Sequence, residues 1–323
     1  MKFSKYDSKM VGTLYHTRAE EAVKEGLALN LTDFSRDKQK VMLLLVDPQI
    51  GFIHAGRPLC VPGAIEDTRR TIEWIYRNVE KLTYIAASLD THLPFMIFFS
   101  TWFRKADGSP VDQFSRITLA DLNKTVFPVY DFQYEYAPGK KMPWSQWYLT
   151  QLEKTQKDLL HNKQTHTIWP IHTMLGSPEH AIDPALFEAI YWHSGARKSQ
   201  PNFLVKGNVP WTENYSIMET EVNYPLHPNG GVNTPFLGML ENYDLIYIAG
   251  QAKSHCVLET ILSIVRYFSV KAPEVLSRVR ILEDCTSSVV VPGVDFDGAA
   301  NQAFAQLVKE YGLKLVKSTD PIK

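Results

Sequence analysis

The sequence predicts an α/β protein with three layers, in which helices cover both faces of a mainly parallel central sheet. Short runs of consecutive apolar residues are typical of strands that are buried on both faces. Segments with helical spacing of apolar residues alternate with these runs over most of the 323 residues. In addition, polar residues stand directly after several runs, at the carboxyl ends of strands where ligands bind in such sheets.

The apolar runs and periodic segments place the elements along the chain. The first run, VMLLLV, is followed by a loop rich in Gly and Pro and then by a helical pattern with Ile65, Ile72, Ile75, Val79 and Leu82 on one side. Strands are expected at 40–47, 84–90, 203–207, 244–250, 278–284 and 313–318. Helices are expected at 63–82, 257–268 and 296–312.

The domain organisation follows from where this alternation holds. Residues 1–38 are charged and mixed and form an N-terminal extension, whereas 39–323 form one domain. Two stretches fit the alternation poorly and are predicted insertions, at about 104–165 and 221–236. The longer insertion is rich in aromatic residues, which either pack the insertion or a subunit interface, or form a wall of a substrate pocket. These residues are Phe127, Tyr130, Phe132, Tyr134, Tyr136, Trp144, Trp147 and Tyr148.

The composition limits the kinds of binding partner and the cellular compartment that we expect. The 34 Lys and Arg residues nearly balance the 35 Asp and Glu residues, which argues against nucleic acid or an anionic membrane as a partner. The longest apolar runs are far shorter than the about 20 residues that span a bilayer. Three cysteines do not make a disulfide framework in a chain of this length, so we expect a reducing cytoplasm. The expected partners are a small-molecule substrate and further copies of the chain in a homo-oligomer.

Three residues at strand ends could carry chemistry together. Cys256 opens a helix after the run LIYIAG, where the helix dipole favours a thiolate, although a buried thiol can also be a small apolar side chain. Asp47 ends the first strand as either a cap or a buried base. Lys206 ends another strand, and taken alone its ammonium would reach solvent. Lys253 and His255, although adjacent to Cys256 in the sequence, are expected at the pocket edge or on the surface.

A metal site is a further hypothesis. Asp90 and His92 stand two residues apart after the second strand, so an extended backbone would direct both side chains to one side. A carboxylate and an imidazole suit zinc, iron or manganese, but a third ligand is required. His172, after Trp169 and Pro170, is the candidate, although a lone histidine is more often a structural hydrogen-bonding group.

Taken together, the motifs resemble those of the isochorismatase-like cysteine hydrolases, and of the nicotinamidase branch in particular. The resemblance spans about 40–318 and is broken by the two insertions. It rests on several motifs in the family's order. These are VDPQIGF with AGRPLCVPGA, SLDTH, WPIHTMLGSPEHAI, VKG followed by ENYSIME, and DLIYIAGQAKSHCVLET.

The resemblance implies an activity and a role for each matching residue. It implies a triad of Asp47 as acid and base, Lys206 as its charged companion and Cys256 as nucleophile. The implied reaction is the hydrolysis of nicotinamide or a similar small amide to the acid and ammonia through a thioester on Cys256. The resemblance also implies a cis peptide between Gln251 and Ala252, and an oxyanion hole made by the backbone N–H groups of Ala252 and Cys256.

The remaining implied site residues bind metal and substrate. The resemblance implies a divalent metal, normally zinc with iron or manganese as alternatives, held by Asp90, His92 and His172. Its aromatic substrate would stack among three side chains, Phe52, Trp169 and Tyr215.

Departures from the family's pattern bear on the substrate and leave the triad intact. Ser254 replaces the usual acidic residue two positions before the cysteine, YSIME replaces the usual Y-S-A-F, and the stretch LPFMIFFS after the D-x-H is apolar. Alternatives are therefore a related hydrolase of N-carbamoyl or ureido compounds, and a catalytically silent binding or scaffold protein. For Cys60 and Cys285 we expect structural roles.

Overall fold

A parallel sheet of six strands forms the centre of the part of the chain that the computed structural model describes, residues 1–155, 159–161 and 163–323. The strand order is β7–β2–β1–β8–β9–β10, and every neighbouring pair is parallel. The strands are β1 (Val41–Val46), β2 (Tyr84–Asp90), β7 (Asn202–Lys206), β8 (Leu245–Gly250), β9 (Val279–Leu282) and β10 (Lys314–Val316). Each expected strand is present, with ends that differ by a few residues at most.

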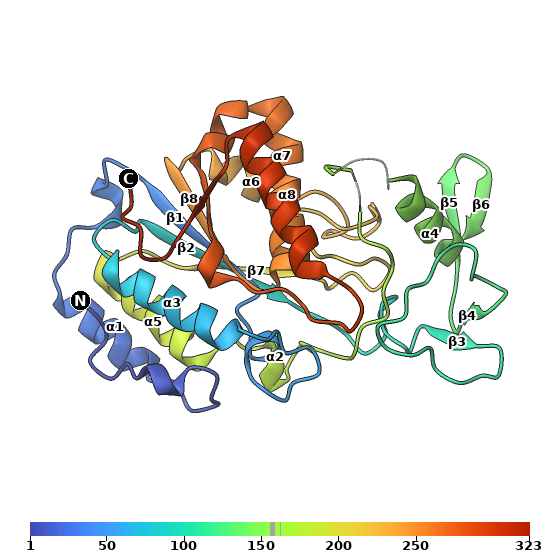
Figure 1. Ribbon diagram of the computed structural model, residues 1–323, viewed down its shortest axis with the longest axis horizontal. Helices are drawn as coiled ribbons and strands as arrows, with labels where there is room; N and C mark the ends of the chain where they lie inside the picture. The colour runs from blue at the N-terminus through green and yellow to red at the C-terminus, as the bar shows by residue number, and fades with distance from the viewer. Residues whose placement is uncertain (156–158, 162) are drawn as a thin grey trace.

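Helices cover both faces of the sheet, as Figure 1 shows. The alternation of side chains along β1 sends Val41, Leu43 and Leu45 into one apolar core, and the residues between them into another. The first core is closed by α3 (Ala64–Arg77) and α5 (Pro184–Arg197), with α1 (Ala19–Ala28) packed outside α5. The second is closed by α6 (Thr234–Leu240), α7 (Leu258–Lys271) and α8 (Phe296–Tyr311). The three-layer α/β prediction is confirmed.

The order of the strands locates a binding site. From β1 the chain proceeds outward to β2 and β7, returns to β8 beside β1, and then proceeds to β9 and β10 in the opposite direction. The order therefore reverses between β1 and β8, and ligands in open α/β sheets bind at the carboxyl ends of the strands beside such a point. Asp47 follows β1 there, and the segment with Cys256 follows β8.

The long insertion forms most of a lobe on one side of the sheet, drawn in green in Figure 1. It contains two antiparallel pairs, β3 (Phe103–Lys105) with β4 (Val126–Pro128) and β5 (Gln133–Ala137) with β6 (Lys140–Pro143), followed by α4 (Trp144–Lys154). Trp144 is fully buried, and its indole Nε1 donates to the carbonyl of Trp211 at 2.7 Å. Many of the insertion's aromatic residues thus pack the lobe and join it to the core. Positions 156–158 and 162 of the expected insertion lie outside the described residues.

Helix α5 was not expected from the sequence, and its surroundings explain why. It is enclosed between the sheet and α1, so most of its residues are buried and it has no polar stripe to reveal a helical period. Gly26 of α1 and Gly195 of α5 allow the two backbones to touch, because a Cβ on Gly195 would lie 2.3 Å from the carbonyl oxygen of Val23.

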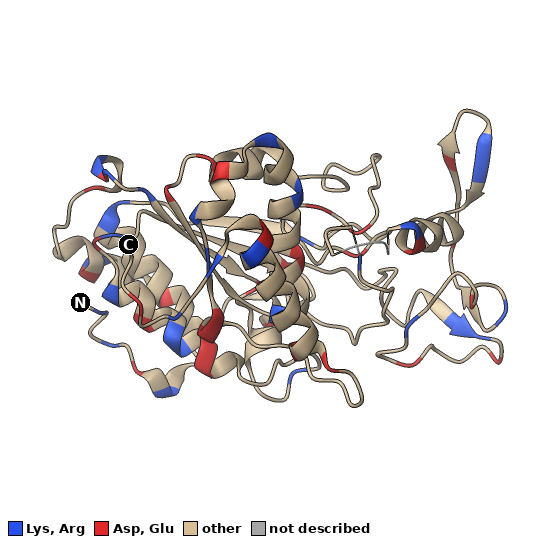
Figure 2. Cartoon of the chain, turned by 45° about the horizontal axis from the view of Figure 1, so that its top comes forward, with Lys and Arg blue, Asp and Glu red and all other residues tan. Residues whose placement is uncertain are grey.

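The surface carries charges of both signs, and Figure 2 shows them scattered over the core and the lobe. This distribution agrees with the formal net charge of -1. In the part of the chain that is described, no helix has the length and apolar character needed to cross a membrane.

Candidate active site

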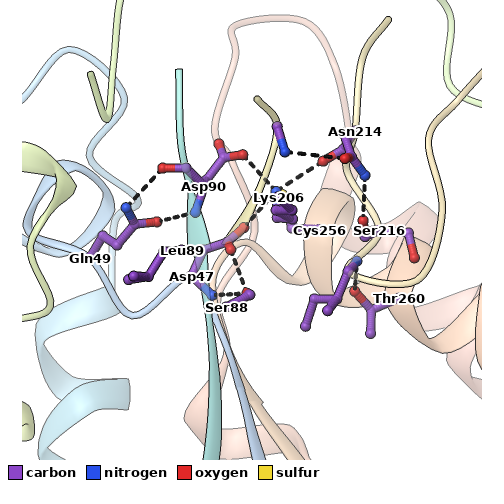
Figure 3. A network of polar contacts seen from close by, with 12 residues as sticks. Asp47, Gln49, Ser88, Leu89, Asp90, Lys206, Asn214, Ser216, Cys256 and Thr260 are labelled. Atoms are coloured by element: carbon purple, nitrogen blue, oxygen red, sulfur yellow. Dashed lines mark hydrogen bonds and ion pairs between the residues drawn. The ribbon is translucent and has the colours of Figure 1, made fainter. Parts of the chain in front are cut away.

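Lys206 is the centre of a buried cluster at the carboxyl ends of β1, β2, β7 and β8 (Figure 3). Its Nζ lies 3.0 Å from Asp47 Oδ2, 2.8 Å from Asp90 Oδ1 and 3.6 Å from Cys256 Sγ, and it donates to the carbonyl of Asn214 at 3.0 Å. Burial lowers the pKa of Lys206, but the carboxylates of Asp47 and Asp90 outweigh burial and hold this pKa well above its ordinary value. The structure therefore brings the three residues of the predicted triad together around a permanent positive charge.

Asp47 is fully buried and is held by a side chain of the neighbouring strand. Its backbone N–H donates to Ser88 Oγ at 2.9 Å, and the Ser88 hydroxyl donates to Asp47 Oδ1 at 2.5 Å. Burial raises the pKa of Asp47, although Lys206 acts in the opposite direction. The carboxylate is thus oriented by Ser88 and has more affinity for a proton than an exposed aspartate.

Cys256 lies in a π-helical turn, Lys253–Val257, that leads from β8 into α7. The peptide bond between Gln251 and Ala252 is cis, as the family resemblance implied. The Gln251 side chain donates from Nε2 to Asp67 Oδ2 on α3 at 2.9 Å, which ties this turn to a second helix. Burial raises the pKa of Cys256 well above its ordinary value, with Lys206 opposing it, so the resting thiol is protonated.

Asp90, His92 and His172 form a second cluster that shares Asp90 with the first. Asp90 Oδ2 lies 2.9 Å from His92 Nε2 and 3.4 Å from His172 Nε2, and the two Nε2 atoms are 3.2 Å apart. Among the described residues these three form the one group of His, Cys, Asp and Glu side chains whose ligand atoms converge closely enough for a metal ion. Gln49 fixes the backbone of Asp90 by hydrogen bonds to both its N–H and its carbonyl.

The donor set fits a divalent metal. His92 Nδ1 lies 3.0 Å from the carbonyl of Gly207, and His172 Nδ1 lies 2.8 Å from the carbonyl of Pro170. A carbonyl only accepts hydrogen bonds, so each Nδ1 carries a proton and each Nε2 is the ring nitrogen that would bind a metal. Two ligands of a tetrahedral zinc ion lie about 3.4 Å apart, close to the observed spacing.

A small pocket of about 400 Å³, open at its mouth, leads to both clusters. Its walls include the three aromatic residues that the sequence predicts for substrate stacking. Trp169 donates from Nε1 to the Tyr215 hydroxyl at 2.9 Å, which fixes both rings. The lining residues are Phe52, Leu59, Asp90, Trp169, His172, Lys206, Glu213, Tyr215, Ala252, His255, Cys256 and Val289. Aromatic walls with a few polar groups at the floor are typical of a pocket that binds a small molecule.

Sequence reasoning misplaced the two neighbours of Cys256. His255 is a buried wall of the pocket and not an edge residue, with its ring centroid 5.3 Å from that of Trp169. Lys253 is also buried, and its Nζ lies 3.0 Å from Asp297 Oδ1 on α8.

Glu213 is a functional candidate that the sequence did not reveal. Its carboxyl group lines the pocket beside Asp90 and Lys206, and burial raises its pKa to about 7. Its position at the start of ENYSIME, two residues before the motif tyrosine Tyr215, was the available signal. The following residue, Asn214, accepts from the backbone N–H of Gly207 through Oδ1 and so fixes the loop after β7.

Comparison with known proteins agrees with the fold. No family model and no curated protein matches the chain. A nicotinamidase/pyrazinamidase of Acinetobacter baumanii is 17% identical, with a TM-score of 0.51, and the match covers 88% of this chain and 99% of that one. The yeast nicotinamidase is also 17% identical, with a TM-score of 0.53 and a match over 86% of this chain and 99% of that one. Its complex with the inhibitor nicotinaldehyde gives a TM-score of 0.52 at the same identity.

These similarities define the class of fold. The chain has the α/β fold of the isochorismatase-like hydrolases, as its motifs predicted. The three solved structures named above are nicotinamidases with this fold.

Proposed function

We propose that this chain is a cysteine-dependent amidohydrolase that converts a small amide, with nicotinamide as the first candidate, to the acid and ammonia. One observation carries the proposal: Lys206 Nζ lies 3.0 Å from Asp47 Oδ2 and 3.6 Å from Cys256 Sγ at the floor of a pocket with aromatic walls. The similarity of the fold to nicotinamidases supports the same activity.

In the first step the Asp47 carboxylate takes the proton of the Cys256 thiol. Burial raises the pKa of both groups, so the two proton affinities move in the same direction and the transfer stays feasible inside the protein. The transfer leaves the net charge of the triad unchanged, and the Lys206 ammonium remains beside both groups. The thiolate sulfur then attacks the amide carbonyl carbon and forms the C–S bond.

In the following steps the carbonyl electrons move onto oxygen, and the backbone N–H groups of Ala252 and Cys256 are the proposed donors to this oxyanion. As the C–N bond breaks, Asp47 returns its proton to the leaving nitrogen and ammonia departs. Asp47 then takes a proton from water, which attacks the thioester and releases the acid. Asp47 passes that proton to the leaving sulfur, which restores the free thiol and the carboxylate.

Asp90, His92 and His172 would hold a divalent metal at the wall of the same pocket. Such an ion supplies a Lewis-acidic point that fixes a ring nitrogen or another donor atom of the substrate. Asp90 also accepts from Lys206, so one carboxylate would connect the two clusters and set their separation.

The direct test is ammonia release from nicotinamide by the wild-type protein and by Cys256→Ala. We expect the substitution to reduce the rate by roughly 10⁴-fold or more, because no other group can form the thioester. Cys60→Ala is the matched control, since Cys60 lies outside the pocket, and it should retain the wild-type rate. Ammonia release that survives in Cys256→Ala would remove the proposed nucleophile.

A parallel screen of N-carbamoyl and ureido compounds separates the two hydrolase alternatives. A wild-type protein that releases ammonia from none of these compounds or from nicotinamide would favour a silent binding protein of the same fold.

A further inference from the structure

The long insertion reaches the mouth of the pocket through a short antiparallel pairing. Residues 114–117 run beside 166–169, with the Phe114 N–H donating to the carbonyl of Ile168 at 2.5 Å and the Ile117 N–H donating to that of His166 at 2.9 Å. Arg116 is the pairing partner of Thr167 in this arrangement. Because Trp169 is a wall of the pocket, the pairing fixes the insertion segment at the pocket's rim.

Phe114 extends the aromatic wall outward. Its ring lies edge-on to Trp169, with the centroids 5.9 Å apart, and 39% of the residue is exposed. Its backbone φ is 64°, in the left-handed region that bulky residues rarely adopt. The backbone hydrogen bond to Ile168 holds this conformation, so the position of the ring at the rim is defined by the pairing.

Arg116 lies on the pocket side of the same pairing. Side chains of directly paired residues share one face, and Trp169, two residues after Thr167, points to that face as well. The electrostatics agree: burial lowers the pKa of His255 to about 4, and the positive charge of Arg116 adds to that decrease. The guanidinium therefore acts on a residue that lines the pocket.

The charge of Arg116 is uncompensated among residues 1–155, 159–161 and 163–323, where no acidic side chain forms an ion pair with it. Several other basic side chains of the described residues are paired. Arg57 contacts Glu179 at 2.8 Å, and Lys105 contacts Asp112 at 2.7 Å. Arg116 itself is exposed at the rim, so its guanidinium is available to a ligand.

We propose that Arg116 selects amides that carry an anionic group, such as a carboxylate, on the part of the molecule that extends out of the pocket. The pocket is small and open at its mouth, so a larger substrate would extend outward, where Phe114 and Arg116 lie beside Trp169. Arginine pairs with carboxylates through two parallel hydrogen bonds, which gives orientation as well as attraction. This inference rests on the proposed amidase function and specifies its substrate class.

The test compares carboxylated amides with uncharged counterparts: 3- and 4-carbamoylbenzoate against benzamide, and glutaramate against butyramide. For the wild-type protein we expect kcat/KM to be higher for the charged member of at least one pair. In Arg116→Ala, kcat/KM for that charged amide should fall about tenfold, mainly through KM, with less than about a twofold change for the neutral one. Arg116→Glu should fall further, and Arg116→Lys should retain part of the preference.

Arg104→Ala is the matched control, because Arg104 is an exposed arginine of the same insertion that pairs with Phe127 and Pro110 and takes no part in the pairing of 114–117 with 166–169. It should leave both rates unchanged. Added salt should reduce the preference of the wild-type protein for the charged amide and have little effect on the neutral one.

The possible outcomes distinguish the amidase function from the role of Arg116. Hydrolysis of amides with the same charged-to-neutral ratio in the wild-type and Arg116→Ala proteins overturns the role of Arg116 and leaves the amidase function standing. A wild-type protein that hydrolyses no amide in the panel, nor nicotinamide, overturns both.

Discussion

Two buried lysines of this protein each lie close to two acidic side chains, but only one of them also lies beside a thiol and a pocket. Lys206 lies between Asp47 and Asp90 at 3.0 and 2.8 Å, whereas Lys163 lies 3.4 Å from Glu219 and 3.7 Å from Glu221. Lys206 also lies beside the Cys256 thiol, and both residues line the pocket.

The cluster around Lys163 has neither a thiol nor a share of that pocket. Both carboxyl oxygens of Glu221 and the Nζ of Lys163 are buried without a hydrogen bond among the described residues. The cluster joins the ends of the two insertions to Glu259 and Arg266 of α7, the helix that follows Cys256. Buried charge alone therefore does not distinguish the two clusters, and the difference lies in access to a thiol and a cavity.

Replacing each lysine by methionine tests most directly whether the two clusters differ in function. Lys206→Met should reduce kcat/KM by roughly 10³-fold or more, because the thiolate and the oxyanion lose their neighbouring positive charge. Lys163→Met should keep kcat/KM within about threefold and lower the thermal midpoint, since it removes the ammonium that lies beside the buried carboxyl groups of Glu219 and Glu221. Steady-state amide hydrolysis and a thermal melt of both variants check this. Equal losses of activity would show that the two clusters are not distinct in function.

Zinc binding is a second property in which the two clusters should differ. The ligand atoms of Asp90, His92 and His172 converge, so we expect about one zinc ion per chain after dialysis against zinc and then buffer. His172→Ala should weaken zinc binding at least about tenfold, whereas Glu259→Gln in the Lys163 cluster should leave it unchanged. Elemental analysis of the purified proteins measures both. Zinc lost equally in the two variants would contradict the assignment of the site.

The cluster around Lys206 could be predicted from the sequence because its members follow recognisable strands. Asp47, Lys206 and Cys256 each stand where an apolar run ends, and parallel strands bring such positions to one edge of the sheet. Ser88 and Glu213 were not found, since a serine within a strand and a glutamate in a loop have no local pattern that distinguishes them. Their importance arises only from packing against Asp47 and the pocket.

The cluster around Lys163 could not be predicted for a different reason. Its members come from three segments, around 163, 219–221 and 259–266, of which the first two lie in or beside insertions without periodic structure. No motif relates these segments in sequence. Likewise α5 was missed because burial on nearly all sides removed its amphipathic pattern. Sequence patterns thus reveal buried apolar strands, helices with one exposed face and residues that end strands, whereas the long-range pairing of charges is a property of the folded chain.

The smallest expected effect concerns the pH dependence of stability in the Lys163 cluster. Burial raises the pKa of Glu221 from 4.5 to about 8, although Lys163 and Arg266 act against this and Glu259 with it. The folded protein therefore keeps a proton that the unfolded chain loses, so the stability from this group falls as the pH rises from about 4.5 to about 8.

Glu221→Gln removes this titration while keeping the shape of the side chain. Its thermal midpoint should match that of the wild-type protein near pH 5 and exceed it by about 3 °C at pH 8.5. At the higher pH the wild-type protein either holds a charged carboxylate in its interior or keeps Glu221 protonated, and both cost free energy of folding. Glu274→Gln, at an exposed glutamate, is the control and should show no such divergence. Melting curves across this pH range give the answer. A difference that is constant with pH, or that grows toward acid, would mean that Glu221 is charged in the folded protein and that the Lys163 cluster is a compensated ion network like that of Lys206.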